Sequence, residues 1–125
     1  MKYLCLVYGE ERAMASMDDR HCLAFDADLR ASGHCIASEA LQPVATATTV
    51  RVRNGKVSVT DGPFAETKEA LAGFDLLEAR DLTEAIRLAS RIPPAQVGSI
   101  EVRPVRPIRE APRIADEIGA AAPER

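Results

Sequence analysis

An Asn-Gly pair between two runs rich in β-branched residues is the feature that most restricts the fold of this chain. Residues 45–53 precede Asn54-Gly55, and residues 56–60 follow it. A type I′ turn needs positive φ at both central positions, which Asn and Gly adopt readily. The pair therefore predicts a β-hairpin with a two-residue loop, and with it antiparallel β-structure near the middle of the chain.

Strand and helix patterns on both sides of the hairpin predict its surroundings. Four further segments have the period of β-strands, at residues 2–8, 34–41, 71–79 and 99–105. Between the first two, Ser16 and Asp19 form a capping box for a helix that ends near Gly33. Between the last two, a helix begins at Asp81 and stops before Pro93.

This order of elements predicts an α+β fold. Two β-α-β units around a hairpin match a ferredoxin-like split β-α-β plan with an inserted β-hairpin, an antiparallel sheet and two helices on one face. The other face of the sheet is then either polar or covered by a second subunit that encloses a cavity. A length of 125 residues suits one domain, which we place at residues 1–106. Residues 107–125 form a C-terminal tail, expected to be partly mobile, with a possible short helix near residues 114–118.

The segment from Leu41 to Phe74, with Asp61-Gly62-Pro63-Phe64 inside it, resembles the signature of the DGPF group of YCII-related proteins. The first and last predicted strands also resemble those of the family, so the likeness extends over residues 1–106. The resemblance implies a ferredoxin-like fold, a homodimer through the sheet face in the manner of dimeric α/β barrels, and a small cleft near the motif. It also implies a possible association with an extracytoplasmic-function sigma factor.

Asp61 is the candidate catalytic residue. It ends a predicted strand and is followed by Gly62 and Pro63, so its carboxylate has a defined position. A hydrophobic neighbour such as Phe64 would raise the pKa of that carboxyl toward neutrality and suit it to general base catalysis. The competing interpretation is structural, because Asp-Gly-Pro is also good turn chemistry.

Six residues are candidates for substrate binding. They are Phe64, Glu66, Thr67, Lys68, Glu39 and Arg103. A loop lysine holds an anionic group and a neighbouring hydroxyl orients it, although charged loops are commonly just solvated. Strand alternation places Glu39 on one face with Cys35 and Ala37. Arg103 lies in the last strand, in a cavity or in an ion pair at a dimer face.

Charge and composition exclude several classes of partner. A net charge of −3 gives no general attraction to nucleic acid or to anionic membranes. No apolar run approaches the length of a membrane span and no signal-peptide pattern opens the chain, so we expect a cytoplasmic location. The His-Cys pairs at residues 21–22 and 34–35 do not predict a metal site, because adjacent side chains diverge. No cofactor-binding motif is present.

Two functional hypotheses follow. The first is an acid–base enzyme of the lyase or isomerase type that acts on a small polar organic molecule near Asp61. The alternative is a non-catalytic ligand-sensing or regulatory module that works with a sigma factor. Whether the chain is an enzyme is left open by the sequence.

Overall fold

A computed structural model describes residues 1–109 of the chain. The expected helix near residues 114–118, and most of the predicted tail, lie outside the described residues. In chain order the elements are β1 (Lys2–Gly9), α1 (Glu11–Ala15), α2 (Asp19–Ala31), β2 (Cys35–Ala40), the 3₁₀ turn η1 (Val44–Thr46), β3 (Thr48–Arg53), β4 (Lys56–Asp61), β5 (Ala70–Glu78), α3 (Leu82–Ala89), the 3₁₀ turn η2 (Pro93–Gln96) and β6 (Ser99–Pro104).

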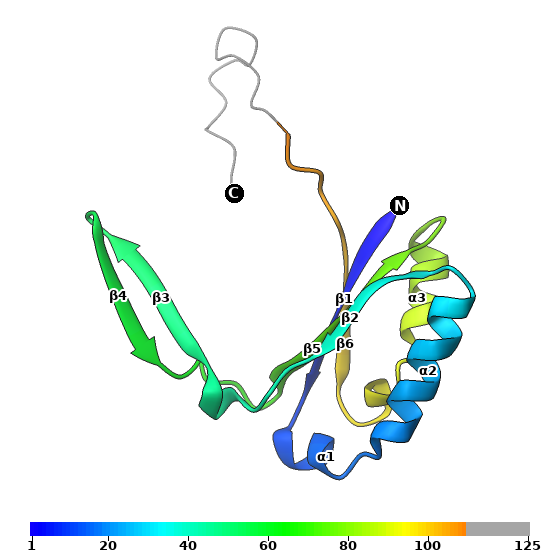
Figure 1. The fold of residues 1–125 in the computed structure, drawn as a ribbon, viewed down its shortest axis with the longest axis horizontal. Helices are drawn as coiled ribbons and strands as arrows, with labels where there is room; N and C mark the ends of the chain where they lie inside the picture. Colours follow the sequence, from blue (N-terminus) through cyan, green and yellow to red (C-terminus); the bar gives the residue numbers. More distant parts are fainter. Residues whose placement is uncertain (110–125) are drawn as a thin grey trace, which may run out of the picture.

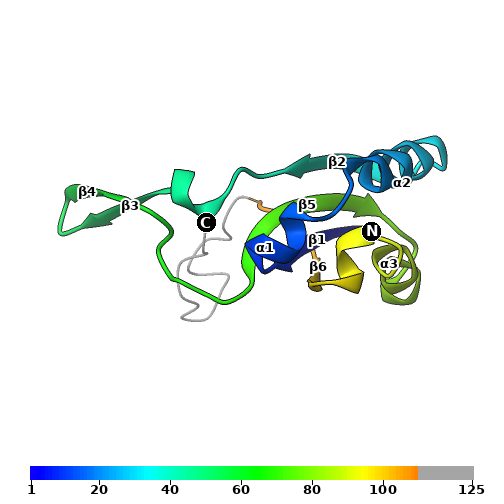
Figure 2. The same cartoon turned by 90° about the horizontal axis from the view of Figure 1, so that it is seen from below.

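A four-stranded antiparallel sheet forms the centre of the structure. Its strand order is β2-β5-β1-β6. Helices α2 and α3 lie on the same face of this sheet (Figures 1 and 2). The predicted α+β class is confirmed, and the arrangement is compatible with a ferredoxin-like fold.

The hydrophobic core lies between the sheet and the two helices. Alternate residues of β1, namely Tyr3, Cys5 and Val7, are buried on the helix-covered face. They pack with Leu77 of β5 and with Leu29 of α2, both of which are fully buried. The period-2 pattern of the strands therefore positions the core.

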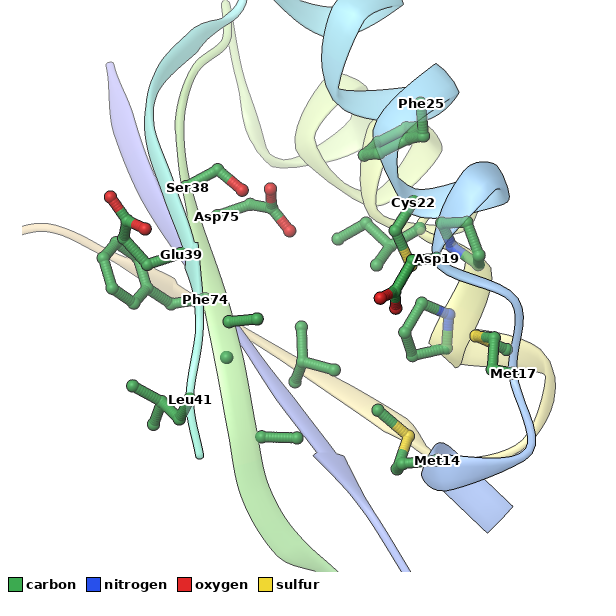
Figure 3. Close-up of a pocket in the computed structure, with 17 residues that line it drawn as sticks. Met14, Met17, Asp19, Cys22, Phe25, Ser38, Glu39, Leu41, Phe74 and Asp75 are labelled. Atoms are coloured by element: carbon green, nitrogen blue, oxygen red, sulfur yellow. The ribbon is translucent and has the colours of Figure 1, made fainter. Parts of the chain in front are cut away.

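An irregularity in β2 changes the face on which its residues lie. The register between β2 and β5 shifts between Cys35 and Ala37. Cys35 packs against the core, whereas Glu39 points away from the helices (Figure 3). The expectation that Cys35 and Glu39 share a face was therefore wrong, because a bulge interrupts simple alternation.

Helix α2 begins later than the sequence suggested. The carboxylate of Asp18 caps it and accepts a hydrogen bond from the backbone N–H of Arg20 at 2.8 Å. Ser16 instead ends the separate short helix α1, and its hydroxyl donates to the carbonyl of Ala13. Ser16 and Asp18 are both good N-cap residues, and the structure uses Asp18, which directly precedes the helix. The predicted cap at Asp81 of α3 is confirmed, because its carboxylate accepts from the N–H of Glu84 at 2.9 Å.

Strands β3 and β4 form a separate two-stranded sheet, which we call the hairpin arm. Asn54 and Gly55 at its turn have φ angles of 52° and 74°. The arm extends away from the four-stranded sheet and the helices (Figures 1 and 2). Its first strand starts at Thr48 rather than at residue 45, because the preceding residues form η1.

Gly98 allows the chain entering β6 to approach β1 closely. A Cβ at this position would collide with the backbone carbonyl oxygen of Tyr8, which cannot move without disturbing the sheet. We expect Gly98→Ala to lower the free energy of unfolding by about 1–3 kcal/mol. Gly9→Ala is the matched control, because its Cβ meets only the flexible side chain of Met14. Urea denaturation measures the free energy of unfolding of the two variants. An equal loss in Gly98→Ala and Gly9→Ala would contradict the proposed collision with the Tyr8 carbonyl.

Candidate functional site

A cavity of about 280 Å³ lies between the four-stranded sheet and helix α2. Its wall combines side chains from α1, α2, β2 and β5 with the prolines of η2 (Figure 3). Most of the wall is apolar and includes Met14, Phe25 and Pro94. Ser38 and Asp75 place polar atoms on the sheet side.

Asp75 is the most unusual residue of this cavity. Its side chain points toward the helices, beside that of Ser38 on the neighbouring strand (Figure 3). Only 6% of the residue is exposed. Strand alternation explains the position, since Gly73 and Leu77, two residues away on each side, are buried on the same face.

Burial raises the pKa of the Asp75 carboxyl above its usual range. A hydrogen bond from Ser38 opposes this increase, and the carboxylate of Asp26 adds to it. The guanidinium of Arg30 lowers the pKa, but Arg30 is already bound to Asp26 at 2.9 Å. Asp75 is therefore a buried acid whose charged form is poorly compensated.

The three cysteines lie near this carboxyl and are poor nucleophiles. Burial, followed by the charge of Asp75, raises the pKa of Cys5 to about 12. Burial also raises the pKa values of Cys22 and Cys35. Since the thiolate is the reactive form, these side chains contribute bulk and polarizability to the site rather than covalent chemistry.

The predicted residues Glu39 and Arg103 lie on the opposite face of the sheet. Glu39 is part of the cavity rim, but its carboxylate points away from the helices (Figure 3). Arg103 binds the neighbouring Glu101 at 2.8 Å, and both side chains are exposed. Ile100 and Val102 take the core side of β6, which leaves the charged pair on the open face.

The loop around the predicted catalytic Asp61 lies apart from the cavity within one subunit. Asp61 is exposed at the end of β4, and 77% of Phe64 is exposed. Gly62 has a φ of 95°, and its N–H donates to the carbonyl of Ala47 at 2.7 Å. The hydrogen bond to Ala47 continues the pairing of β3 and β4 beyond Thr48 and Asp61, so the backbone has a defined conformation here.

The other loop candidates are exposed as well. The hydroxyl of Thr67 donates to the carbonyl of Glu69 at 2.7 Å, and the ammonium of Lys68 lies 3.9 Å from the carboxylate of Glu10. Glu66 is exposed to solvent. Whether Asp61, Phe64 and these residues bind a ligand stays a prediction.

Sequence reasoning missed Asp75, although the sequence contains a signal for it. An acid stands between Phe74 and Leu76 in a central strand, where apolar residues dominate. Once the faces of the strand are assigned, this acid falls on the same face as Leu77. A charged residue at a core position is a candidate functional residue.

Within residues 1–109, no three His, Cys, Asp or Glu side chains gather in a way that would hold a metal ion. The helices of this part of the chain are too short or too polar to cross a membrane.

Replacing Asp75 by Asn should change the pH dependence of stability. The raised folded-state pKa means that the contribution of Asp75 to stability is fully present below its unfolded pKa, near 3.8, and is lost as pH rises through the folded pKa. We therefore expect Asp75→Asn to unfold at a higher urea concentration than wild type at pH 7. This advantage should shrink as pH falls toward 4. An advantage that is the same at pH 4 and pH 7 would contradict the burial of a charged group.

Comparison with known proteins identifies relatives of the chain. An uncharacterised protein of Rhizobium meliloti is 46% identical over 67 residues, which is 52% of this chain and 54% of that protein. The chain thus spans about half the length of this relative in the match. A model of the YCII-related domain matches residues 1–109, which are also the residues that contain the sheet, the helices and the cavity. The chain belongs to the YCII-related domain family.

Proposed function

We propose that this protein is an acid–base enzyme of the lyase or isomerase type, which acts on a small polar organic molecule in the cavity beside Asp75. The observation that carries the proposal is the buried Asp75 carboxyl, with its raised pKa, on the wall of a cavity of about 280 Å³. A general acid–base group works best when its pKa lies near the working pH. Burial moves the pKa of Asp75 in that direction.

The chemistry follows from a single carboxyl. In its carboxylate form Asp75 takes a proton from a carbon next to a carbonyl group of the substrate, and an enolate forms. The same carboxyl then returns the proton to another carbon, which completes an isomerisation. If a leaving group departs from the neighbouring carbon instead, the reaction is a lyase-type elimination. The hydroxyl of Ser38 orients the carboxylate in both cases.

The apolar wall supports this role. Met14, Phe25 and Ile92 line the cavity on the side of the helices. Side chains of this kind exclude water and lower the local dielectric constant, which keeps the pKa of Asp75 raised.

We propose further that the protein works as a homodimer whose subunits meet through the open face of the sheet. On this face, Leu76 is paired with Leu4, and Phe74 with Leu6, across β5 and β1. All four side chains are only partly buried within one subunit. A contiguous apolar surface of this kind is typical of a face that another molecule covers.

The hairpin arm offers a second uncovered apolar surface. Val50 is paired with Val59, and Val52 with Val57, so the four valines share one face of the arm. Each of them is 56–65% exposed. An isolated two-stranded hairpin is marginally stable in water, which favours a partner subunit beneath the valine face.

In the proposed dimer, the Asp61 loop of one subunit lies against the other subunit. The loop follows the hairpin arm, which extends away from the four-stranded sheet of the same subunit (Figure 2). In this proposal the arm brings Asp61 and the loop residues to the partner subunit. There Asp61, Phe64, Glu66, Thr67 and Lys68 meet Glu39 and Arg103 of the open sheet face and form a second binding site, separate from the cavity beside Asp75, in which Asp61 is the acid–base group.

Proton exchange tests the enzymatic proposal. Small aldehydes and ketones, with and without amino groups, are incubated with the protein in D₂O, and loss of their C–H signals is followed by NMR. We expect exchange above the buffer rate with at least one compound, and a loss of about 100-fold or more in Asp75→Asn. Asp61→Asn, analysed in parallel, distinguishes the contribution of Asp61 to the exchange rate from that of Asp75.

Exchange that Asp75→Asn retains would contradict the role of Asp75, and no exchange with any compound would contradict the enzyme. Ligand binding without exchange would favour the alternative of a ligand-sensing module. Co-purification with a sigma factor tests that alternative.

Light scattering after gel filtration tests the dimer. We expect wild type to have the mass of two chains, and Leu6→Lys to have the mass of one, because the substitution places a charge in the apolar centre of the open face. Val59→Lys should also weaken the dimer. Thr60→Lys is its matched control, since Thr60 is the adjacent residue on the other face of the arm. A monomeric wild type, or a loss of dimer that is equal in Val59→Lys and Thr60→Lys, would contradict the proposed interface.

A further inference from the structure

We propose that the cavity binds a small organic amine as a cation, with the ammonium group beside Asp75 and the apolar part against the helix side of the wall. This inference rests on the proposed function in one respect, because it concerns the same cavity. It requires only binding, and it holds or fails independently of turnover.

The charge of the lining is the first argument. Asp19 and Asp75 place carboxyl groups in the cavity, whereas the carboxylate of Glu39, on the rim, points away from it. Among the described residues that form this cavity, there is no Lys, Arg or His. A ligand with a carboxylate or a phosphate would meet like charge and no cation. An ammonium group meets opposite charge, and the site discriminates between the two by repulsion as well as by attraction.

The nearby arginines compensate the charge of Asp75 only in part, because each is bound to another carboxylate. Arg30 is bound to the carboxylate of Asp26 at 2.9 Å. Arg91 is bound to Asp28, and its guanidinium lies 5.6 Å from the centre of the Phe25 ring. A buried carboxylate needs a cationic partner or else takes up a proton. A ligand ammonium supplies the cation that the protein does not place there.

The shape of the cavity limits the rest of the ligand. A volume of about 280 Å³ is at the small end of ligand sites. Met14, Met17 and Phe25 offer polarizable and aromatic surface to an apolar group. A second hollow of about 210 Å³ shares Met14 and Leu41 with the first and continues toward α1. The geometry therefore suits an amine with one ring or a short branched chain.

Binding should depend on pH in a defined direction. Affinity rises as pH increases through the pKa of Asp75, since the carboxylate form attracts the cation. It falls again when the amine itself loses its proton. The charged groups that act on Asp75 are Asp26 and Arg30, the thiols of Cys5, Cys22 and Cys35 lie near it, and Asp19 lines the same cavity from α2. Burial keeps the three thiols neutral at physiological pH, and Asp26 and Arg30 neutralise one another, so Asp75 dominates the profile.

Three probes of one size test the inference by isothermal titration calorimetry. Benzylamine carries the cation, benzyl alcohol is neutral, and benzoate is an anion. We expect wild type at pH 7 to bind benzylamine at least about tenfold more tightly than benzyl alcohol, and to bind benzoate most weakly. Asp75→Asn should reduce benzylamine affinity by about tenfold or more and leave benzyl alcohol affinity nearly unchanged.

Asp19→Asn is the control for general negative charge, because Asp19 is exposed at the rim. It should weaken benzylamine binding less than Asp75→Asn does. The pH profile of wild type with benzylamine provides a second measurement that needs no variant. Equal affinity for the three probes, tighter binding of benzoate, or unchanged benzylamine affinity in a folded Asp75→Asn would overturn the inference. Benzylamine binding, together with no proton exchange in any of the aldehydes and ketones, would support this inference and contradict the enzyme.

Discussion

One unfavourable placement distinguishes this structure, because a carboxyl group lies on the core face of a central strand. Asp75 lies in β5 between two other strands of the sheet and beneath helix α2, with 6% of its surface exposed. Burial disfavours its charge, and Ser38 compensates it only in part. Apolar residues at neighbouring core positions show that the fold accepts hydrophobic side chains there. A protein that retains an acid at such a position carries a cost in stability, and functional sites are where such costs are common.

The two faces of the four-stranded sheet differ in what they carry. The helix-covered face contains the core and the cavity, whereas the open face carries partly exposed leucines with the Glu101–Arg103 ion pair. A homodimer through the open face would leave the cavity of each subunit intact, since the cavity lies on the other side. In the proposed dimer the hairpin arm belongs to the open-face region, because its valines are exposed in one subunit and the Asp61 loop follows directly after it.

Local features were predictable from the sequence, and features that depend on distant contacts were not. The turn at Asn54-Gly55 and the cap at Asp81 each depend on a few adjacent residues, so their chemistry could be recognised directly. The start of α2 was misplaced because Ser16 and Asp18 are both good N-cap residues. The bulge after Cys35 has no signal in composition, and it moved Glu39 to the other face. Asp75 became recognisable as a site residue only when the pairing of β5 showed which face the helices cover.

A carbon-13 NMR titration of the Asp75 carboxyl shows whether this group is a buried acid with a raised pKa. We expect a pKa above the ordinary value of 3.8 in the free protein, because burial disfavours the charged form. Ser38→Ala should raise this pKa further, since it removes the hydrogen bond that stabilises the carboxylate. A carboxyl that titrates at or below 3.8 in the folded wild type would show instead that Asp75 is a solvated or fully paired residue, and the proposed role of the cavity would fail.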